Sequence, residues 1–281
     1  MGGKKMISRR VFIHGACGYV LGALSIGSYS YILEPRWIEV KNVSIEINGL
    51  PERFEGMTIA QLSDIHHSNY IPREFVRKCV RYVNKLFPDI IALTGDFVYS
   101  SQKYLSSVAV ELSELRAKEG VFAVLGNHDD KSSTFDALTM NGINVLVNKS
   151  VPVYKKNEYV FIAGVDDLWV GNFDLDKTLK DTDDKPKILL CHNPDAIEKI
   201  RNTNVDFVMA GHTHGGQINL PFYGPPFIYS KFGNRYVSGL FHEGKTTMYV
   251  NKGLGTSIFP VRFFARPEIT LFTLRNNNQV V

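Results

Sequence analysis

The sequence of 281 residues predicts an α/β fold built around a largely parallel, buried sheet. Short apolar runs alternate with segments of helical periodicity through the first half of the chain. The apolar runs at 57–63, 89–94 and 121–125 each end in polar residues, as strands do when they carry a site at their carboxyl ends. No stretch rich in Pro, Gly and Ser divides residues 37–281, so they are expected to form one domain.

The individual elements follow from local patterns. Residues 39–47 alternate as a strand does, and residues 57–63 form a second short strand. Pro72 opens a helix in which apolar residues recur at helical spacing as far as Leu86, and Pro88 ends it. The further elements expected along the chain are strands at 89–94, 121–125, 143–147, 159–164, 187–190, 205–210, 246–251 and 268–274 and helices at 104–115 and 194–200.

Residues 1–36 form a leader that differs from the rest of the chain. The leader holds five basic residues and one acidic residue, which account for the whole formal net charge of +4. The remainder is neutral overall, so no nucleic-acid partner is expected. Residues 11–33 carry no Asp, Glu, Lys or Arg and are long enough to cross a bilayer. Positive charge before this run predicts a cytoplasmic N-terminus and an exported body.

The run Ser-Arg-Arg-Val-Phe-Ile at 8–13 resembles the twin-arginine signal that directs folded proteins to export. The twin-arginine translocase is therefore an expected partner. No Ala-x-Ala cleavage site follows, and Ser-Tyr-Ser at 28–30 is a weak substitute. Two alternatives remain, an export signal that is removed and an anchor that stays in the membrane. Both predict a bacterial protein at or beyond a membrane, on the periplasmic or cell-envelope side.

Polar residues of a common chemical kind follow five of the predicted strands. In chain order they read Asp-x-His, Gly-Asp, Gly-Asn-His-Asp, His and Gly-His-x-His. Two metal ions that share one bridging carboxylate need such carboxylate, amide and imidazole groups on a rigid frame. This mixture of ligands favours Mn, Fe, Zn or Ni over Ca. The predicted metal ligands are Asp64, His66, Asp96, Asn127, His192, His212 and His214.

These motifs resemble those of the calcineurin-like metallophosphoesterase superfamily. The run Gly-His-Thr-His-Gly-Gly-Gln at 211–217, the run Cys-His-Asn-Pro-Asp at 191–195 and the double-arginine leader are similar to exported bacterial phosphodiesterases of that superfamily. The resemblance covers nearly the whole chain. It implies a four-layer αββα sandwich of two mixed sheets flanked by helices. It also implies two divalent metal ions, with Mn as the first choice and Zn, Fe or Ni as alternatives.

The resemblance further implies a role for each residue of the site. The first metal would be bound by Asp64, His66, Asp96 and His214, and the second by Asp96, Asn127, His192 and His212. The catalytic residue His128 would stabilise the transition state or protonate the leaving oxygen. Asp129 either orients His128 or caps a turn. Tyr99 and Ser100 stand where the protein phosphatases of the superfamily have Asp-Arg, and this difference favours a phosphodiesterase.

The sequence therefore predicts a metal-dependent phosphoric ester hydrolase that acts on a phosphodiester or a pyrophosphate. We expect hydroxide bridging the metals to attack phosphorus directly, without a covalent enzyme intermediate. The expected substrate is a lipid-linked or envelope phosphoester. One alternative is the glycolipid UDP-2,3-diacylglucosamine, whose hydrolysis belongs to lipid A synthesis. An alternative of another class is a membrane-tethered metal-binding protein without turnover.

Three residues are candidates for contact with the substrate. His67 follows His66, but its side chain is expected on the other side of the segment, so a structural role is an equal alternative. Tyr223 belongs to the long aromatic loop 221–239, which is expected to line an acyl or base pocket or to cover the sheet. His242 lies just before an expected turn, and a role in that turn is the alternative.

Overall fold

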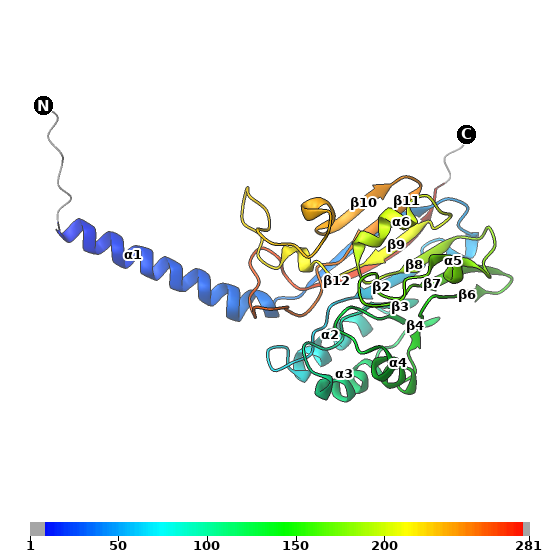
Figure 1. Ribbon diagram of the computed structural model, residues 1–281, viewed down its shortest axis with the longest axis horizontal. Coiled ribbons are helices and arrows are strands. Elements are labelled where there is room, and N and C mark those ends of the chain that lie inside the picture. Colours follow the sequence, from blue (N-terminus) through cyan, green and yellow to red (C-terminus); the bar gives the residue numbers. More distant parts are fainter. Residues whose placement is uncertain (1–8, 278–281) are drawn as a thin grey trace, which may run out of the picture.

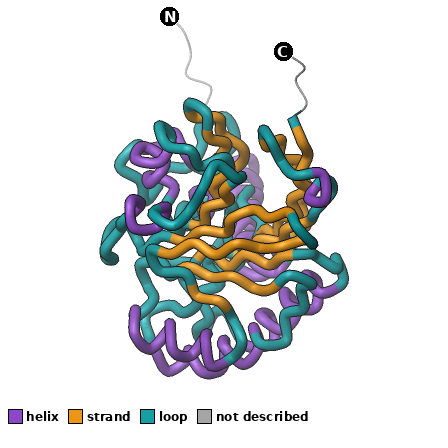
Figure 2. The backbone as a smooth tube through the Cα atoms, turned by 90° about the vertical axis from the view of Figure 1, so that its right-hand side faces the viewer, coloured by secondary structure: helices purple, strands orange, loops and turns teal. Residues whose placement is uncertain are grey.

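The computed structural model describes residues 9–277, which form two stacked six-stranded sheets with helices on their outer faces (Figures 1 and 2). One long helix, α1 (Arg9–Ser28), projects away from this body (Figure 1). The expected four-layer arrangement of two mixed sheets is confirmed. Of the expected twin-arginine motif, Ser8 lies outside the described residues.

The first sheet has the strand order β1-β12-β2-β3-β4-β5. Strands β2 to β5 are parallel, as their connection through helices requires. Strand β12 inserts between β1 and β2 and runs antiparallel to β2, which makes the sheet mixed. The strands are β1 (Glu39–Ile47), β2 (Thr58–Leu62), β3 (Ile90–Thr94), β4 (Gly120–Val124), β5 (Asn144–Val145) and β12 (Glu268–Asn276), and the helices that cover them are α2 (Arg73–Asn84), α3 (Leu105–Leu112) and α4 (Lys131–Met140).

The second sheet has the strand order β10-β11-β9-β8-β7-β6. Its four central strands are parallel, and an antiparallel strand lies at each edge. The strands are β6 (Lys149–Lys155), β7 (Glu158–Gly164), β8 (Lys187–Leu190), β9 (Phe207–Ala210), β10 (Gly239–Glu243) and β11 (Thr246–Val250), and the short helices on the outer face are α5 (Leu175–Leu179) and α6 (Ile197–Ile200). Short 3-10 turns lie at Glu52–Phe54, Gln102–Tyr104, Pro194–Ala196, His214–Gly216 and Gly233–Tyr236.

The core between the sheets is apolar and aromatic. Phe272 of β12 packs edge-to-face against Phe207 of β9 and Tyr249 of β11, with ring centroids 5.1 Å apart in both pairs. Such pairs join the two sheets by burying large apolar surfaces. This rigid double layer holds the strand ends, and hence the loops that follow them, in fixed positions.

Four of the helices and strands were not expected from the sequence: α4, α5, β6 and β10. Helix α4 begins where Asp130 accepts a hydrogen bond from the backbone N–H of Ser133, at 3.0 Å. Strand β6 contains Pro152, which an edge strand tolerates because one side of it forms no ladder. Strand β10 begins at Gly239, the last residue of the expected loop. The predicted helices over 104–115 and 194–200 are shorter and each begins with a 3-10 turn.

The junction between α1 and the body has no flexible linker. A π-helical turn (Tyr29–Leu33) and a 3-10 turn (Glu34–Arg36) follow α1 directly. The backbone N–H of Arg262 donates to the Ser30 carbonyl at 2.9 Å, and that of Ala265 donates to Glu34 Oε1 at 2.6 Å. The segment Phe12–Arg36, with a mean hydropathy of 1.3, is long and apolar enough to cross a membrane. The two hydrogen bonds at Ser30 and Glu34 make the C-terminal end of this helical segment, which we call the foot of α1, part of the folded body.

Candidate metal centre

The predicted ligands lie in loops at the carboxyl ends of strands from both sheets. Asp64 and His66 follow β2, Asp96 follows β3, and His212 and His214 follow β9. All five have positive φ, between 48° and 71°. Such left-handed backbone is uncommon for residues other than glycine and is concentrated at functional sites. The chain therefore turns sharply at these five residues, and this brings their side chains together from three separate segments.

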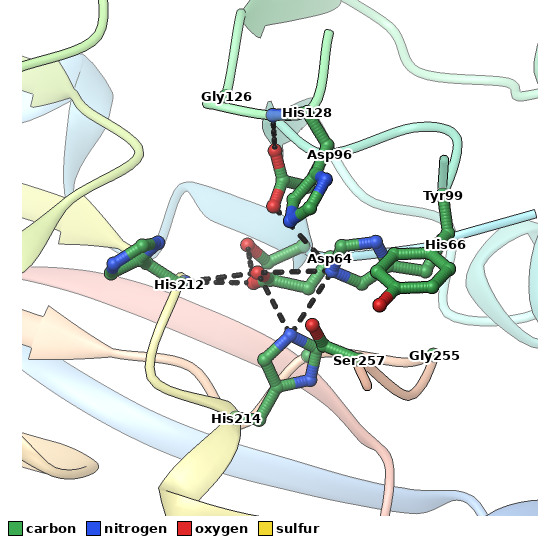
Figure 3. A network of polar contacts seen from close by, with 12 residues as sticks. Asp64, His66, Asp96, Tyr99, Gly126, His128, His212, His214, Gly255 and Ser257 are labelled. Carbon is green, nitrogen blue, oxygen red and sulfur yellow. Dashed lines mark hydrogen bonds and ion pairs between the residues drawn. The ribbon is translucent and has the colours of Figure 1, made fainter. Parts of the chain in front are cut away.

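The first ligand group consists of Asp64, His66 and His214, all of them buried (Figure 3). The Nε2 atoms of His66 and His214 lie 3.1 Å apart. His214 Nε2 is 3.5 Å from Asp64 Oδ1, and His66 Nε2 is 3.4 Å from Asp96 Oδ2. Four possible metal-ligand atoms thus lie close together, Asp64 Oδ1, Asp96 Oδ2 and the Nε2 atoms of His66 and His214. This is the arrangement expected of the first metal site.

The second group consists of Asp96, His192 and His212, again buried. His192 Nε2 lies 3.3 Å from Asp96 Oδ2, 3.1 Å from His212 Nδ1 and 3.1 Å from Asn127 Oδ1. The structure thus brings all seven predicted ligands together in two groups. Asp96 Oδ2 lies 3.4 Å from His66 Nε2 of the first group and 3.3 Å from His192 Nε2 of the second, which is where a bridging carboxylate would lie.

The protonation of these groups suits the binding of cations. Burial lowers the pKa of His66 to about 4 and that of His212 to about 3, so both imidazoles are neutral at pH 7. Burial alone would raise the pKa of Asp96, but the His192 imidazole beside it holds that pKa below its usual range. Asp96 in turn raises the pKa of His192 well above its ordinary value, although burial opposes this. Imidazole binds a metal in its neutral form, so His192 would release its proton when an ion binds. The donor set therefore fits two divalent metal ions.

Glycine is required beside two of the ligands. A Cβ atom at Gly211 would lie 1.9 Å from Ser63 Oγ and 2.4 Å from Asp64 Oδ2. A Cβ atom at Gly126 would lie 2.2 Å from Asp96 Oδ1. Distances this short are impossible for real atoms, so any side chain at these positions displaces a carboxylate of the site.

Asp129 joins two of the ligand loops. Its carboxylate accepts hydrogen bonds from the backbone N–H groups of Asp96 at 2.8 Å, Phe97 at 2.9 Å and Gly126 at 2.9 Å. The buried carboxylate has its pKa raised to about 7 by burial and by the charge of Asp96. The contacts of Asp129 are those of a turn cap, and its carboxylate does not hold the His128 ring.

His128 lies at the open side of the centre. Its backbone N–H donates to Asp96 Oδ1 at 2.8 Å, which fixes the residue to the bridging ligand. Its half-buried ring packs against those of His66 and Tyr99, each with centroids 5.2 Å away (Figure 3). The ring is therefore beside both ligand groups and in reach of solvent, where a leaving group would depart.

The structure gives His67 a structural environment. Its Nδ1 lies 2.7 Å from the Ile71 carbonyl, and its Nε2 lies 2.6 Å from Ser107 Oγ. The ring is buried and packs against Tyr104. Both ring nitrogens have protein partners, which favours the structural alternative, and substrate contact by His67 stays a prediction.

His242 lies at the wrong end of its sheet for a role at the metal centre. It pairs with Thr247 of β11, and Thr247 pairs with Phe207 at the start of β9, whereas the ligands follow the end of β9. The side chain is exposed, with Nδ1 3.2 Å from Thr247 Oγ1. Tyr223 is 76% exposed in its loop and is free to contact a ligand from solvent. Its contact with substrate stays a prediction.

A buried arginine behind the first ligand group was not anticipated. Arg262 is fully buried, and its Nη2 lies 3.4 Å from His214 Nδ1. It also donates to backbone carbonyls of the loop at 252–255, and the Gly255 N–H of that loop donates to the Asp64 carbonyl at 2.7 Å. The one signal in the sequence is a single arginine within the otherwise uncharged segment 253–265.

Comparisons with known proteins agree with this geometry. The model of the calcineurin-like phosphoesterase family matches residues 57–216, which include every ligand described above. The chain is 38% identical to the uncharacterized metallophosphoesterase YkuE of Bacillus subtilis, over 98% of this chain and all of that protein. It is 30% identical to the phosphodiesterase YaeI of Escherichia coli, over 96% of this chain and all of that protein.

A eukaryotic relative is also similar. The transmembrane protein with metallophosphoesterase domain of Danio rerio is 32% identical over 84% of this chain and 57% of its own length. The family model and the bacterial relatives, together with the two ligand groups, identify a metal-dependent phosphoesterase. The chain belongs to the calcineurin-like phosphoesterase family.

Proposed function

We propose that the chain is a membrane-anchored phosphodiesterase that works with two divalent metal ions, with Mn as the first choice. The observation that carries this proposal is the position of Asp96 Oδ2, which faces His66 of one ligand group and His192 of the other. One carboxylate oxygen shared in this way holds two ions close together. Two such ions, when bound, activate water and neutralise the charge of a phosphate group.

The protein's own groups supply the rest of the reaction. The imidazoles and carboxylates of the two ligand groups would hold the ions, and a bound phosphate would lie on the side of the centre where His128 is. His128, fixed through its backbone to Asp96, would stabilise the charge that develops at the phosphate and donate a proton to the leaving oxygen. Attack on phosphorus is direct, since no nucleophilic side chain is needed once water is activated.

The turn after β3 favours a diester over a monoester. Tyr99 stands in this turn and puts a neutral aromatic ring beside His66, with centroids 5.4 Å apart. Its hydroxyl accepts the Ile258 N–H at 3.0 Å and is fixed by that contact. The Tyr99 ring has no positive charge with which to neutralise a second phosphate charge. This side of the site therefore suits the single negative charge of a phosphodiester or of a substituted pyrophosphate group better than the double charge of a monoester.

Residues 1–36 are proposed to anchor residues 37–281 to a bacterial membrane, with the N-terminus in the cytoplasm and the body on the outer side. The apolar helix and the transmembrane names of eukaryotic relatives support association with a membrane. The double arginine supports export by the twin-arginine route. The substrate would be a lipid-linked or envelope phosphoester. If the body remains in the cytoplasm, UDP-2,3-diacylglucosamine becomes the substrate to test.

The activity is tested with bis-p-nitrophenyl phosphate and Mn, Zn, Fe or Ni in turn. The wild-type protein is expected to release p-nitrophenol with at least one metal. His128→Ala is expected to bind metal normally and to react about 10²–10⁴-fold more slowly, the usual contribution of a general acid. His242→Ala is the matched control, with the rate of the wild type, because that histidine lies at the far end of the sheet.

Two results would contradict the proposal in different ways. Absence of turnover with all four metals, although metal binds, would leave a metal-binding protein without activity. Full activity of His128→Ala would remove His128 from the mechanism but leave the metal centre in place. The side of the membrane is tested separately, by adding protease to intact spheroplasts. Digestion of the body there indicates export, and protection indicates a cytoplasmic body.

A further inference from the structure

An apolar pocket opens beside the first ligand group. Its volume is about 530 Å³, within the range of pockets that bind small molecules. Thr213 and His214 form the wall next to the metal centre. The rest of the lining is largely apolar and includes Ile218, Phe227, Ile228, Tyr229, Ile258 and Phe259. Whatever occupies this apolar pocket is therefore in contact with a metal-ligand side chain.

The walls of the apolar pocket are fixed to one another. The Gln217 side chain donates to the carbonyls of Ser257 and Phe259 at 2.9 and 2.8 Å and accepts the Ser257 N–H at 2.8 Å. Asp195, three residues after the ligand His192, holds the aromatic loop by accepting from the Ser230 hydroxyl at 2.6 Å and from the Lys231 N–H at 2.8 Å. Both walls are thus tied to the frame of the metal centre.

Backbone strain lies where the apolar pocket meets the metal centre. Ile258 has φ of 60°, which is rare for a β-branched residue and is retained only where the surroundings enforce it. Its N–H donates to the Tyr99 hydroxyl, and the Tyr99 ring packs against His66 and His128. Through Tyr99, this strained turn connects the lining of the pocket to His66 and His128.

The aromatic side chains of the apolar pocket are exposed, although water is a poor environment for them. Phe227 is 83% exposed and Phe259 is 64% exposed. Exposed apolar side chains gathered around a pocket mark a site for an apolar ligand or surface. The pocket therefore has the chemistry of a site that is filled by hydrocarbon.

The apolar pocket is also close to the foot of α1. Ile218 of its lining forms a parallel bridge with Phe263, and the Asn219 N–H donates to the Phe263 carbonyl at 2.7 Å. The Phe263 ring packs edge-on against Tyr29, just after α1, with centroids 6.4 Å apart. Figure 1 shows the loops of this region beside the end of α1 that meets the body. If α1 lies in a bilayer, the pocket is next to the lipid surface.

We propose that the apolar pocket binds a hydrocarbon chain of the substrate, which would be a membrane lipid with its phosphodiester at the metal centre. This inference rests on the proposed function and adds the class of substrate. The chain would leave the membrane beside α1, pass between Phe227 and Phe259 and end beside His214. The aromatic loop is thereby assigned to the lipid part of the substrate, and Phe227, Tyr229 and Phe259 are specificity-determining residues.

The test uses alkyl p-nitrophenyl phosphates, from methyl to dodecyl, with the full-length protein in phosphatidylcholine nanodiscs and Mn²⁺. Each buried methylene is expected to raise kcat/KM by up to about fourfold until the pocket is filled. Phe227→Ser and Phe259→Ser are expected to flatten this rise, so that the ratio of kcat/KM for the dodecyl substrate to kcat/KM for the methyl substrate falls. Both side chains are exposed, so the fold is expected to tolerate the substitutions.

The matched control is Phe87→Ser, an exposed phenylalanine in the turn after α2, which is expected to keep the wild-type dependence on chain length. If kcat/KM rises equally with chain length in the wild type and in both pocket variants, the proposal is overturned, because partition of the substrate into the bilayer then explains the rise. A wild-type kcat/KM that does not change with chain length would overturn the proposal as well.

Failure of the proposed function would look different. If the methyl substrate is not hydrolysed with any metal, binding of dodecyl phosphate is measured by calorimetry instead. Weaker binding to both pocket variants than to the wild type and to Phe87→Ser would then support the pocket without the activity. Equal binding to all four proteins would overturn the pocket as well.

Discussion

Replacing Arg262 tests whether a residue that touches no substrate controls the metal centre. The guanidinium group donates to four backbone carbonyls, those of Gly255 at 3.0 Å, Ala265 at 2.6 Å, Lys252 at 3.0 Å and Gly253 at 3.1 Å. Burial lowers the pKa of Arg262 to about 10, so the group is charged at pH 7. A buried cation with this many partners holds its loop in a single conformation.

That loop supports the strand that carries the first ligands. The Leu254 N–H donates to the Ser63 carbonyl at 2.9 Å, and the Gly255 N–H donates to the Asp64 carbonyl at 2.7 Å. Arg262→Met keeps much of the side-chain volume but removes the hydrogen bonds to all four carbonyls, of which Gly253 alone keeps another donor, the Glu268 N–H at 3.1 Å. At about 1 kcal/mol each, this lowers the free energy of unfolding by about 4 kcal/mol, less than the stability of many domains.

The expected effect on metal binding is separate from the effect on stability. Changes in the partners of metal ligands typically cost 10–100-fold in affinity, which is about 1.4–2.8 kcal/mol. We expect Arg262→Met to weaken binding of one Mn²⁺ by this factor in a calorimetric titration. Arg262→Lys keeps the charge but not the planar fork of donors, so it is expected to fall between Met and the wild type.

Arg266→Met is the control from the same loop. Arg266 stacks on Trp37 at 4.2 Å and donates to the Trp37 carbonyl, away from the ligands, so metal affinity is expected to be that of the wild type. Circular dichroism shows whether each variant is folded before titration. A folded Arg262→Met protein with two metal sites of wild-type affinity would refute the argument.

Two further substitutions test other parts of the structure. Gly211→Ala puts a methyl group 2.4 Å from Asp64 Oδ2, so we expect at least one metal ion to bind more than about tenfold more weakly, measured by calorimetry; unchanged affinity at both sites would contradict the geometry. The second substitution is at Glu111, where hydrogen bonds from Arg77 hold the pKa of the carboxyl below its usual range. The ionised carboxylate therefore stabilises the fold at pH values above its pKa in the unfolded chain, and this stabilisation is lost as the pH falls through its pKa in the folded protein. Glu111→Gln is therefore expected to lower the free energy of unfolding by at most about 1 kcal/mol at pH 7, because the arginines are half exposed, and by progressively less as the pH falls through the folded pKa of Glu111. Urea titrations at pH 7 and over a series of lower pH values measure this difference, and a difference that does not change with pH would contradict the argument.

The sequence was sufficient for the features that depend on local pattern. Strands β2, β3 and β4 are largely apolar, and the polar residues after them are candidate ligands that the structure brings together. The edge strands were harder to identify. In β6, Pro152 contradicts the pattern of a strand, and only the position at the edge makes it acceptable. Such a position is a property of the whole sheet.

Long-range contacts account for the parts of the site that were not predicted. His67 follows a candidate ligand in the sequence, but its Nε2 is hydrogen-bonded to Ser107 of helix α3, 40 residues further along the chain. Arg262 binds backbone carbonyls, which are present at every residue and leave no trace in the pattern of side chains. The apolar pocket likewise needs Ile218, Phe227 and Ile258 from three separate segments. None of these partners can be paired from spacing in a single sequence.

The direct connection between α1 and the body has a kinetic consequence for an enzyme on a membrane. The Ser30 carbonyl accepts from Arg262, so the catalytic body does not swing freely at the end of a tether. An enzyme held in this way meets a lipid substrate by diffusion in two dimensions. Its rate then follows the mole fraction of that lipid in the surface rather than the amount per volume of solution. Diluting the membrane with an inert lipid would slow such an enzyme, whereas diluting the suspension with buffer would not.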